Sequence, residues 1–281
     1  MVDCHMHMVL DGCYWKSAID RHREKPDVVW IREVLEIYRQ KGFTYLRDCG
    51  DRWGVGETAR ALAPEYGITY RTPLASLYKK GHYGGIIGLP FETCGEFAAL
   101  VRENRDKGAD FIKIMISGLM DFDHYGVLTE DGLEAGEIKE LIHIAHEEGM
   151  AVSVHGNGVA NVLAAAEAGV DSVEHGAYLN EETLQAMAEA GTVWVPTLST
   201  IGNLRGKGRF SEADVERTLA SALENVALFT RMGGLIAPGS DAGAWEVPHG
   251  ITTEYILLEQ ALGKCADAVL SAGTAQIQRK F

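Results

Sequence analysis

The chain has a deficit of basic residues, no long hydrophobic run and no paired cysteine motif. Its formal net charge of −14 disfavours contact with phosphate backbones and anionic membranes, so neither nucleic acid nor a membrane is expected as a partner. No run of 18 apolar residues marks a membrane-spanning helix, and no basic segment followed by an apolar one marks a secretory leader. The scattered cysteines, with no CxxC pair, are typical of reduced thiols in a cytoplasmic protein. They are Cys4, Cys13, Cys49, Cys94 and Cys265.

Nucleotide-binding signals are also missing, since no GxGxxG follows a first strand and no GxxxxGK[ST] occurs. Short apolar runs instead alternate with longer helical patterns about eight times, which is typical of repeated βα units. We therefore predict an α/β protein with a (β/α)₈ (TIM) barrel as a single domain over 1–281, with an open doubly wound sheet as the competing fold. The expected strands are Val2–Met8, Phe43–Asp48, Ile68–Ser76, Ala109–Ser117, Met150–His155, Asp171–His175, Thr192–Pro196 and Leu235–Asp241.

Helices are predicted between these strands, several of them ending at a glycine that precedes the next apolar run. The expected helices are 30–41, 54–63, 93–107, 135–148, 158–168, 180–190, 211–231, 249–262 and 265–274, and the glycines are Gly42, Gly108, Gly149, Gly169 and Gly191. Long segments follow four of the strands. In a barrel these segments lie on the C-terminal face, where active sites are built.

His5 and His7 form an HxH pair at the end of the first expected strand. Residues i and i+2 of a strand point to the same face, so both imidazoles can reach one ion. The pair alone is weak evidence, because most such pairs are not metal sites. Its position at a barrel mouth favours metal binding.

Lys113 lies on the inward face of its expected strand, where a cation is costly unless it is paired or loses its charge. One interpretation is an ion pair with Asp241 or another carboxylate. The other is a desolvated amine that reacts with CO₂ to give an anionic carbamate, whose two oxygens could bridge two cations.

Three further residues stand at strand ends. His155 and His175 end consecutive strands, and each is followed directly by glycine. Asp241 follows the eighth strand in a GSDAG segment, where it could cap a turn or act as a metal ligand and general base. Imidazole nitrogens suit zinc and similar ions. Together with the HxH pair and Lys113, these residues predict a metal site.

Residues on the loops at the barrel mouth are candidates for substrate contact, since imidazole and aromatic groups there often orient a bound carboxylate. They are His82, Tyr83, His124, Tyr125 and His249. Tyr14 and Trp15 could cover the site or pack at the surface.

The combination resembles the amidohydrolase superfamily, in the imidazolonepropionase- and prolidase-like branch. The matching stretches span nearly the whole chain: VDCHMH, TYLRDCG, GHYGG, FIKIMISG, VSVHGNG, AGVDSVEHG, VPTL, GSDAG and the HG…A…SAGTAQ tail.

The resemblance implies a pair of divalent ions, with zinc the first expectation. His5, His7 and Asp241 would bind the more buried ion, His155 and His175 the more exposed one, and carboxylated Lys113 would bridge them. A hydroxide held between the ions would attack the carbonyl of a small molecule, while Asp241 takes its proton and passes it to the leaving nitrogen.

The chain departs from the family in two ways. Relatives carry a small β-sandwich built from residues before the HxH strand and after the barrel, and this domain is expected to be largely absent, which favours a homo-oligomer. In addition, Leu119 follows Ser117 and Gly118 where relatives often read SGG, so a different pocket is expected.

Three functions stay open. Hydrolysis of a C–N bond in a dipeptide, N-acyl amino acid or cyclic amide ranks first. Deamination ranks low, because no acid follows His155 in the HGNG segment, and lactone or phosphoester hydrolysis on the same site is a further possibility. A catalytically idle barrel that binds a ligand or partner is the alternative from another class, although it would not require all six ligand positions.

Overall fold

The computed structural model describes residues 1–281 and contains a strand in each of the eight regions predicted from the sequence. These strands are β1 (Val2–Met6), β2 (Tyr45–Asp48), β3 (Thr69–Arg71), β6 (Ile112–Met115), β7 (Val152–Gly156), β8 (Ser172–His175), β9 (Val193–Val195) and β10 (Leu235–Ile236). Two short strands were not predicted, β4 (Leu77–Lys79) and β5 (Leu89–Phe91).

All strand pairs are parallel, and they form two sheets. One sheet has the order β1-β2-β3, and the other has the order β10-β9-β8-β7-β6-β4-β5. The α/β class with parallel strands is therefore as expected, but the strands do not pair as one closed ladder.

The two interruptions have local causes. The predicted third strand, 68–76, ends early because Pro73 has no N–H group and Leu74 has a left-handed φ of 62°. The eighth shortens to two residues because Pro238 and Gly239 follow it. Backbone hydrogen bonds nevertheless cross between the sheets, from Cys4 N to Pro238 O at 2.8 Å.

The main helices agree with the predicted ranges to within a few residues, except that the last continues to Lys280. They are α2 (Val28–Gln40), α3 (Val55–Leu62), α4 (Cys94–Asp106), α5 (Ala135–Glu147), α6 (Val159–Glu167), α7 (Glu181–Ala190), α9 (Glu212–Arg231), α10 (Thr253–Leu262) and α11 (Ala266–Lys280). The sequence did not predict α1 (Trp15–His22), α8 (Ser199–Gly202) or the 3₁₀ turns at Ala63–Tyr66 and Gly263–Cys265. All five predicted stop glycines have positive φ, as a left-handed helix end requires.

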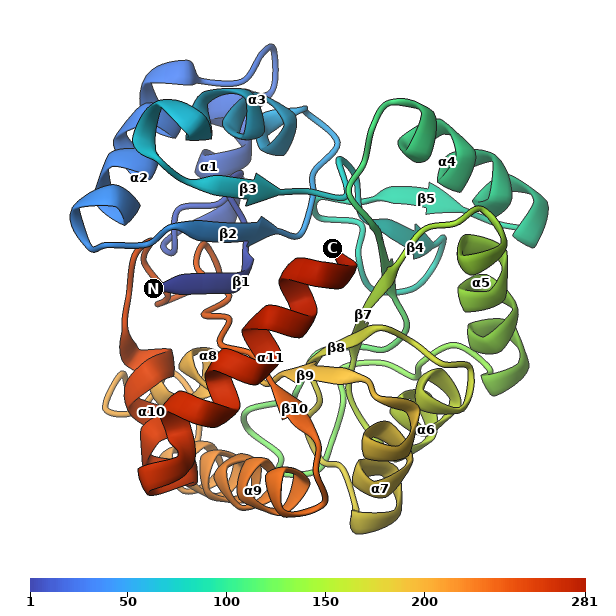
Figure 1. Cartoon of the computed structure of the whole chain (residues 1–281), viewed down its shortest axis with the longest axis vertical. Helices are drawn as coiled ribbons and strands as arrows, with labels where there is room; N and C mark the ends of the chain where they lie inside the picture. The colour runs from blue at the N-terminus through green and yellow to red at the C-terminus, as the bar shows by residue number, and fades with distance from the viewer.

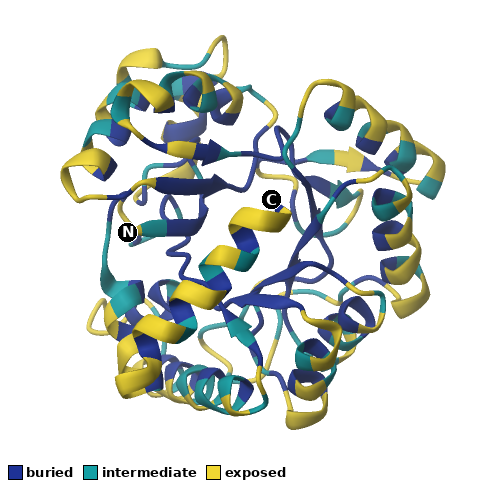
Figure 2. Ribbon diagram, in the orientation of Figure 1, coloured by how far each residue is buried: buried dark blue, intermediate teal, exposed yellow.

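The helices lie around the outside of the strands, and α11 crosses the face nearest the viewer in Figure 1. Most strands are buried, except for parts of β3, β4 and β5, whereas the outer helices bury one side each, as Figure 2 shows. Gly273 of α11 lies so close to β10 that an added Cβ would be 1.9 Å from Ile236 O. An apolar cluster joins α11 to the beginnings of the strands through Ile277 and Phe281. The helix therefore covers the N-terminal ends of the strands and leaves the other ends for the loops.

None of the helices has the length and apolar character that a membrane-spanning helix needs.

Candidate metal centre and active-site cavity

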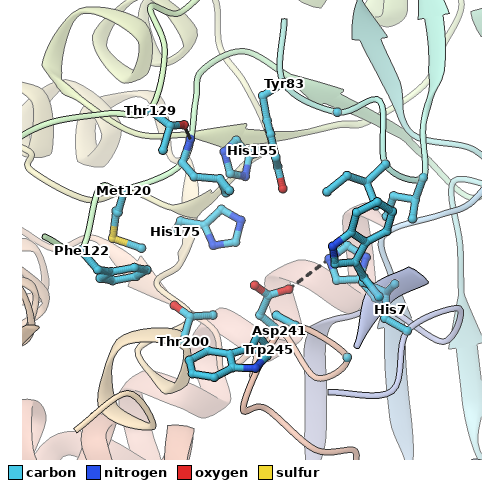
Figure 3. Close-up of a pocket in the computed structure, with 18 of the residues that line it drawn as sticks. His7, Tyr83, Met120, Phe122, Thr129, His155, His175, Thr200, Asp241 and Trp245 are labelled. Atoms are coloured by element: carbon cyan, nitrogen blue, oxygen red, sulfur yellow. Dashed lines mark hydrogen bonds and ion pairs between the residues drawn. The ribbon is translucent and has the colours of Figure 1, made fainter. Parts of the chain in front are cut away.

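The side chains predicted to bind metal converge at the C-terminal ends of the strands. All six line one cavity of about 560 Å³: His5, His7, Lys113, His155, His175 and Asp241. The His5 ring centroid is 5.4 Å from that of His7 and 4.9 Å from that of His175, which is itself 4.5 Å from that of His155. Figure 3 shows His155, His175 and Asp241 facing the same space from different elements.

Asp241 lies between the two histidines of the HxH pair. Its Oδ1 atom is 3.3 Å from His5 Nε2 and 3.0 Å from His7 Nε2. The carboxylate is aimed by a backbone turn in which Asp241 has a left-handed φ of 59°. Asp3 holds this turn, because its carboxylate accepts hydrogen bonds from Ser240 N at 2.8 Å and Ser240 Oγ at 2.6 Å. Although burial opposes ionisation, His5 and His7 hold the pKa of Asp241 well below its ordinary value.

The other nitrogen of His5 is engaged by a carboxylate that the sequence did not single out. His5 Nδ1 is 2.6 Å from Glu174 Oε2. Glu174 is fully buried and also accepts hydrogen bonds from Arg47 Nη2 at 2.7 Å, Ser153 Oγ at 2.8 Å and Ser172 Oγ at 2.6 Å. Burial would raise the pKa of Glu174, but Arg47 and Lys113 hold it well below its ordinary value. The charged carboxylate can therefore accept from His5 Nδ1–H, which directs Nε2 toward Asp241.

His155 is buried, His175 is half-buried, and both are neutral. Burial, with Lys113 nearby, lowers the pKa of His155 to about 3, and burial together with His155 lowers the pKa of His175 well below its ordinary value. His175 Nδ1 is 2.7 Å from Thr197 Oγ1, and both residues have positive φ, 69° and 48°. Such backbone strain is frequent at functional sites. A neutral imidazole is also the form that binds a metal.

Lys113 forms no ion pair at contact distance. Its Nζ atom has a single hydrogen-bond contact, 3.5 Å from Ser153 Oγ, and it forms no ion pair with Asp241. Burial lowers the pKa of Lys113 from its ordinary value. The expected contact ion pair is therefore absent, although Glu174 and Asp241 lie close enough to act on the charge of Lys113. A desolvated amine remains, which is the state that a carbamate requires.

The donor set fits a cation. His5 Nε2, His7 Nδ1 and Asp241 Oδ1 are buried atoms without a hydrogen-bond partner, and such atoms are costly unless something else satisfies them. Two groups of donors lie within 4.8 Å of one another, His5 with His175 and Asp241, and His5 with His7 and Cys49. Imidazole, carboxylate and thiol groups are ordinary ligands of zinc and similar ions.

Only one of the five predicted substrate residues lines the cavity. Tyr83 does so, with its ring centroid 4.8 Å from that of His155. His82 lies 3.9 Å from Glu130, and the exposed His124 pairs with Asp121 at 2.9 Å.

Tyr125 and His249 also lie elsewhere. The Tyr125 ring meets the Tyr178 ring edge-to-face, and the Arg217 guanidinium lies over it. His249 is buried beside Tyr38, with Nε2 2.8 Å from Leu10 O, and burial lowers its pKa to about 4. Neither lines the cavity, so a substrate contact for these two residues stays a prediction that the cavity does not support.

Aromatic and apolar residues from several loops form the rest of the cavity wall, and most of them were missed from the sequence. They are Leu10, Tyr14, Trp15, Ile86, Ile87, Leu119, Met120, Phe122, Leu204, Phe210 and Trp245. Figure 3 shows Met120, Phe122 and Trp245 facing the metal-ligand candidates. Arg209 also lines the cavity, with its guanidinium carbon 4.2 Å from the Trp245 ring centroid. Arg209 forms no ion pair. Its guanidinium is therefore an unpaired positive charge beside apolar side chains of the cavity.

No family model matches the chain, but individual proteins do. Ochratoxinase of Aspergillus niger is 28% identical over 96% of this chain and 64% of its own length. Its crystal structure matches with a TM-score of 0.79 and 24% identity, over 99% of this chain and 70% of the other. An uncharacterised protein of Mycobacterium tuberculosis is 30% identical, over 99% of this chain and 72% of its own.

A solved Xaa-Pro dipeptidase with bound methionine shares the fold, with a TM-score of 0.79 and 23% identity, over 99% of this chain and 75% of the other. The chain spans 64% of the length of the ochratoxinase that it matches. The chain therefore belongs to one family with the mycobacterial protein, and it shares the fold of the solved dipeptidase, ochratoxinase and amidohydrolase structures.

Proposed function

We propose that the chain is a metal-dependent amidohydrolase that cleaves an amide bond of a small molecule. One observation carries the proposal: six donor side chains from five strand ends line one cavity, and three of them have buried atoms without partners. The relatives support it, since the matched proteins include an ochratoxinase and an Xaa-Pro dipeptidase.

We also infer that the two sheets are halves of one (β/α)₈ barrel. The hydrogen bonds from Asp241 N to His5 O at 2.7 Å and from His7 N to Ala242 O at 2.7 Å support closure on one side. On the other side the chain runs directly from β3 into β4, and Asp110 N donates to Thr72 O at 3.0 Å. A single domain over 1–281, a cytoplasmic location and homo-oligomerisation stay predictions.

His5, His7 and Asp241 would hold one divalent ion, His155 and His175 a second, and a carbamate on Lys113 would bridge them. To form it, the neutral Nζ of Lys113 attacks CO₂ and loses a proton. Bound divalent ions would polarise the scissile carbonyl and make water acidic near neutral pH.

Side chains of the protein would transfer the proton and position the substrate. Asp241 is ionised, so it can take the proton from the attacking water and return it to the nitrogen as the C–N bond breaks. Tyr83, which lines the cavity beside His155, can position the amide beside the reacting centre.

The wall also favours a substrate class. Phe122, Phe210 and Trp245 offer ring faces to a large apolar or aromatic group. Arg209 is stacked on Trp245, which leaves the in-plane N–H donors of its guanidinium free for a carboxylate. We therefore favour N-acyl amino acids or dipeptides with an aromatic side chain over small cyclic amides.

The test is hydrolysis of N-acyl-phenylalanines and dipeptides by protein purified without chelator. We expect release of the free amino acid, loss after chelation, recovery on adding zinc with bicarbonate, and no activity in Asp241→Asn. Binding of these amides without turnover, in fully metal-loaded protein, would favour the idle ligand-binding barrel.

A further inference from the structure

Cys49 lies beside the HxH pair. It follows β2 directly, is 2% exposed, and its Sγ lies within 4.8 Å of a ring nitrogen of both His5 and His7. The other buried free thiol, Cys4, lies instead in the apolar cluster beneath α11. Cys49 is therefore the one cysteine grouped with imidazole donors.

The backbone fixes this position. Cys49 N donates to Met6 O at 2.9 Å, and Met6 stands between the two histidines. The preceding Asp48 accepts hydrogen bonds from Met8 N at 3.1 Å and Gly50 N at 3.0 Å. Gly50 has a φ of 83°, and a Cβ there would be 2.9 Å from Ser76 N. The sharp turn after Cys49 therefore holds the thiol against the end of β1.

A second observation indicates that something binds here. His5 is 1% exposed, its Nδ1 is engaged by Glu174, and its Nε2 has no hydrogen-bond partner. The buried Nδ1 of His7 has none either. A cation bound between the two imidazoles and the sulfur would satisfy a nitrogen of this kind.

We propose that Cys49 is a thiolate ligand of the divalent ion held by His5 and His7. This inference rests on the proposed metal centre and extends its donor set. On binding, the S–H bond is replaced by an S–metal bond and the proton passes to solvent. A thiolate among imidazoles favours zinc or cobalt over magnesium or manganese.

The test is cobalt(II) substitution of the full chain, read by absorption spectroscopy. Cobalt bound to a thiolate gives a charge-transfer band in the near ultraviolet, which nitrogen and oxygen ligands do not give. We expect this band in the wild type and in Cys13→Ser, whose exposed thiol also lines the cavity. We expect Cys49→Ser and Cys49→Ala to lack it and to bind cobalt at least about tenfold more weakly.

Zinc-edge X-ray absorption is the second measurement, with a sulfur shell expected at about 2.3 Å in the wild type and none in Cys49→Ser. Circular dichroism of both Cys49 variants checks that the fold is kept. Cobalt bound without the band, or a band that persists in Cys49→Ser, would overturn the thiolate ligand and leave the metal centre standing. Failure of the wild type to bind cobalt or zinc at all would overturn both.

Discussion

Glu174 Oε2 lies 2.6 Å from His5 Nδ1, and both side chains are buried. The carboxylate is at the same time 2.7 Å from Arg47 Nη2. This contact turns the free nitrogen of His5 toward Asp241. Glu174 is thus a positioning residue for the metal centre and the partner of a buried cation.

Glu174→Gln should weaken the metal centre without unfolding the protein. The amide cannot accept from His5 as strongly as a carboxylate, so metal affinity should fall about tenfold to hundredfold. Glu174→Ala should in addition lower the free energy of unfolding by about 3–5 kcal/mol, because Arg47 is left buried and unpaired. Competition with a chromophoric chelator and urea unfolding measure the two effects. Exposed Glu182 supplies the control, Glu182→Gln, in which neither should change.

Arg209→Met should change substrate selection and leave the chemistry intact. Methionine keeps the apolar contact with Trp245 but removes the in-plane donors. We expect KM for an N-acyl-phenylalanine to rise about tenfold to hundredfold, the contribution of hydrogen bonds to a charged group. KM for the corresponding neutral phenylalaninamide should stay the same. Equal effects on both substrates would contradict the assigned carboxylate contact.

Glu254 should make stability depend on pH. Burial raises the pKa of this carboxyl to about 8, and its Oε2 accepts from Ser199 N at 2.8 Å. Between its ordinary pKa and about 8, the folded state keeps a proton that the unfolded state releases. The free energy of unfolding therefore falls as pH rises through this window, by at most about 1.4 kcal/mol per pH unit.

Glu254→Gln removes this dependence. Urea unfolding at pH 5 and pH 8 should show a smaller loss in Glu254→Gln than in the wild type. Glu259→Gln, an exposed position on the same helix, should keep the wild-type loss. Equal loss in all three proteins would mean that Glu254 is already ionised in the folded state.

Much of the fold could be predicted because its signals are local. Stop glycines and apolar runs placed nearly every strand and helix, and the i, i+2 spacing put His5 and His7 on one side of β1. Glu174 was not predicted as part of the site, because alternation along a strand places adjacent side chains on opposite faces of the sheet. His175 departs from extended geometry with a φ of 69°, so both Glu174 and His175 face the interior.

The cavity wall was harder to predict. Arg209 and Trp245 lie on loops, and loop length and composition do not specify a path in space. His249 shows the same limit: it follows a strand end, yet its hydrogen bond to Leu10 O turns it away from the cavity.

Metal content is the most direct test of the central claim. Elemental analysis of protein purified without chelator should find about two equivalents of zinc, iron or manganese in the wild type. Lys113→Ala should hold about one or none, because the bridging carbamate cannot form. Wild-type protein that stays metal-free after addition of metal and bicarbonate, or Lys113→Ala that keeps both ions, would contradict the account.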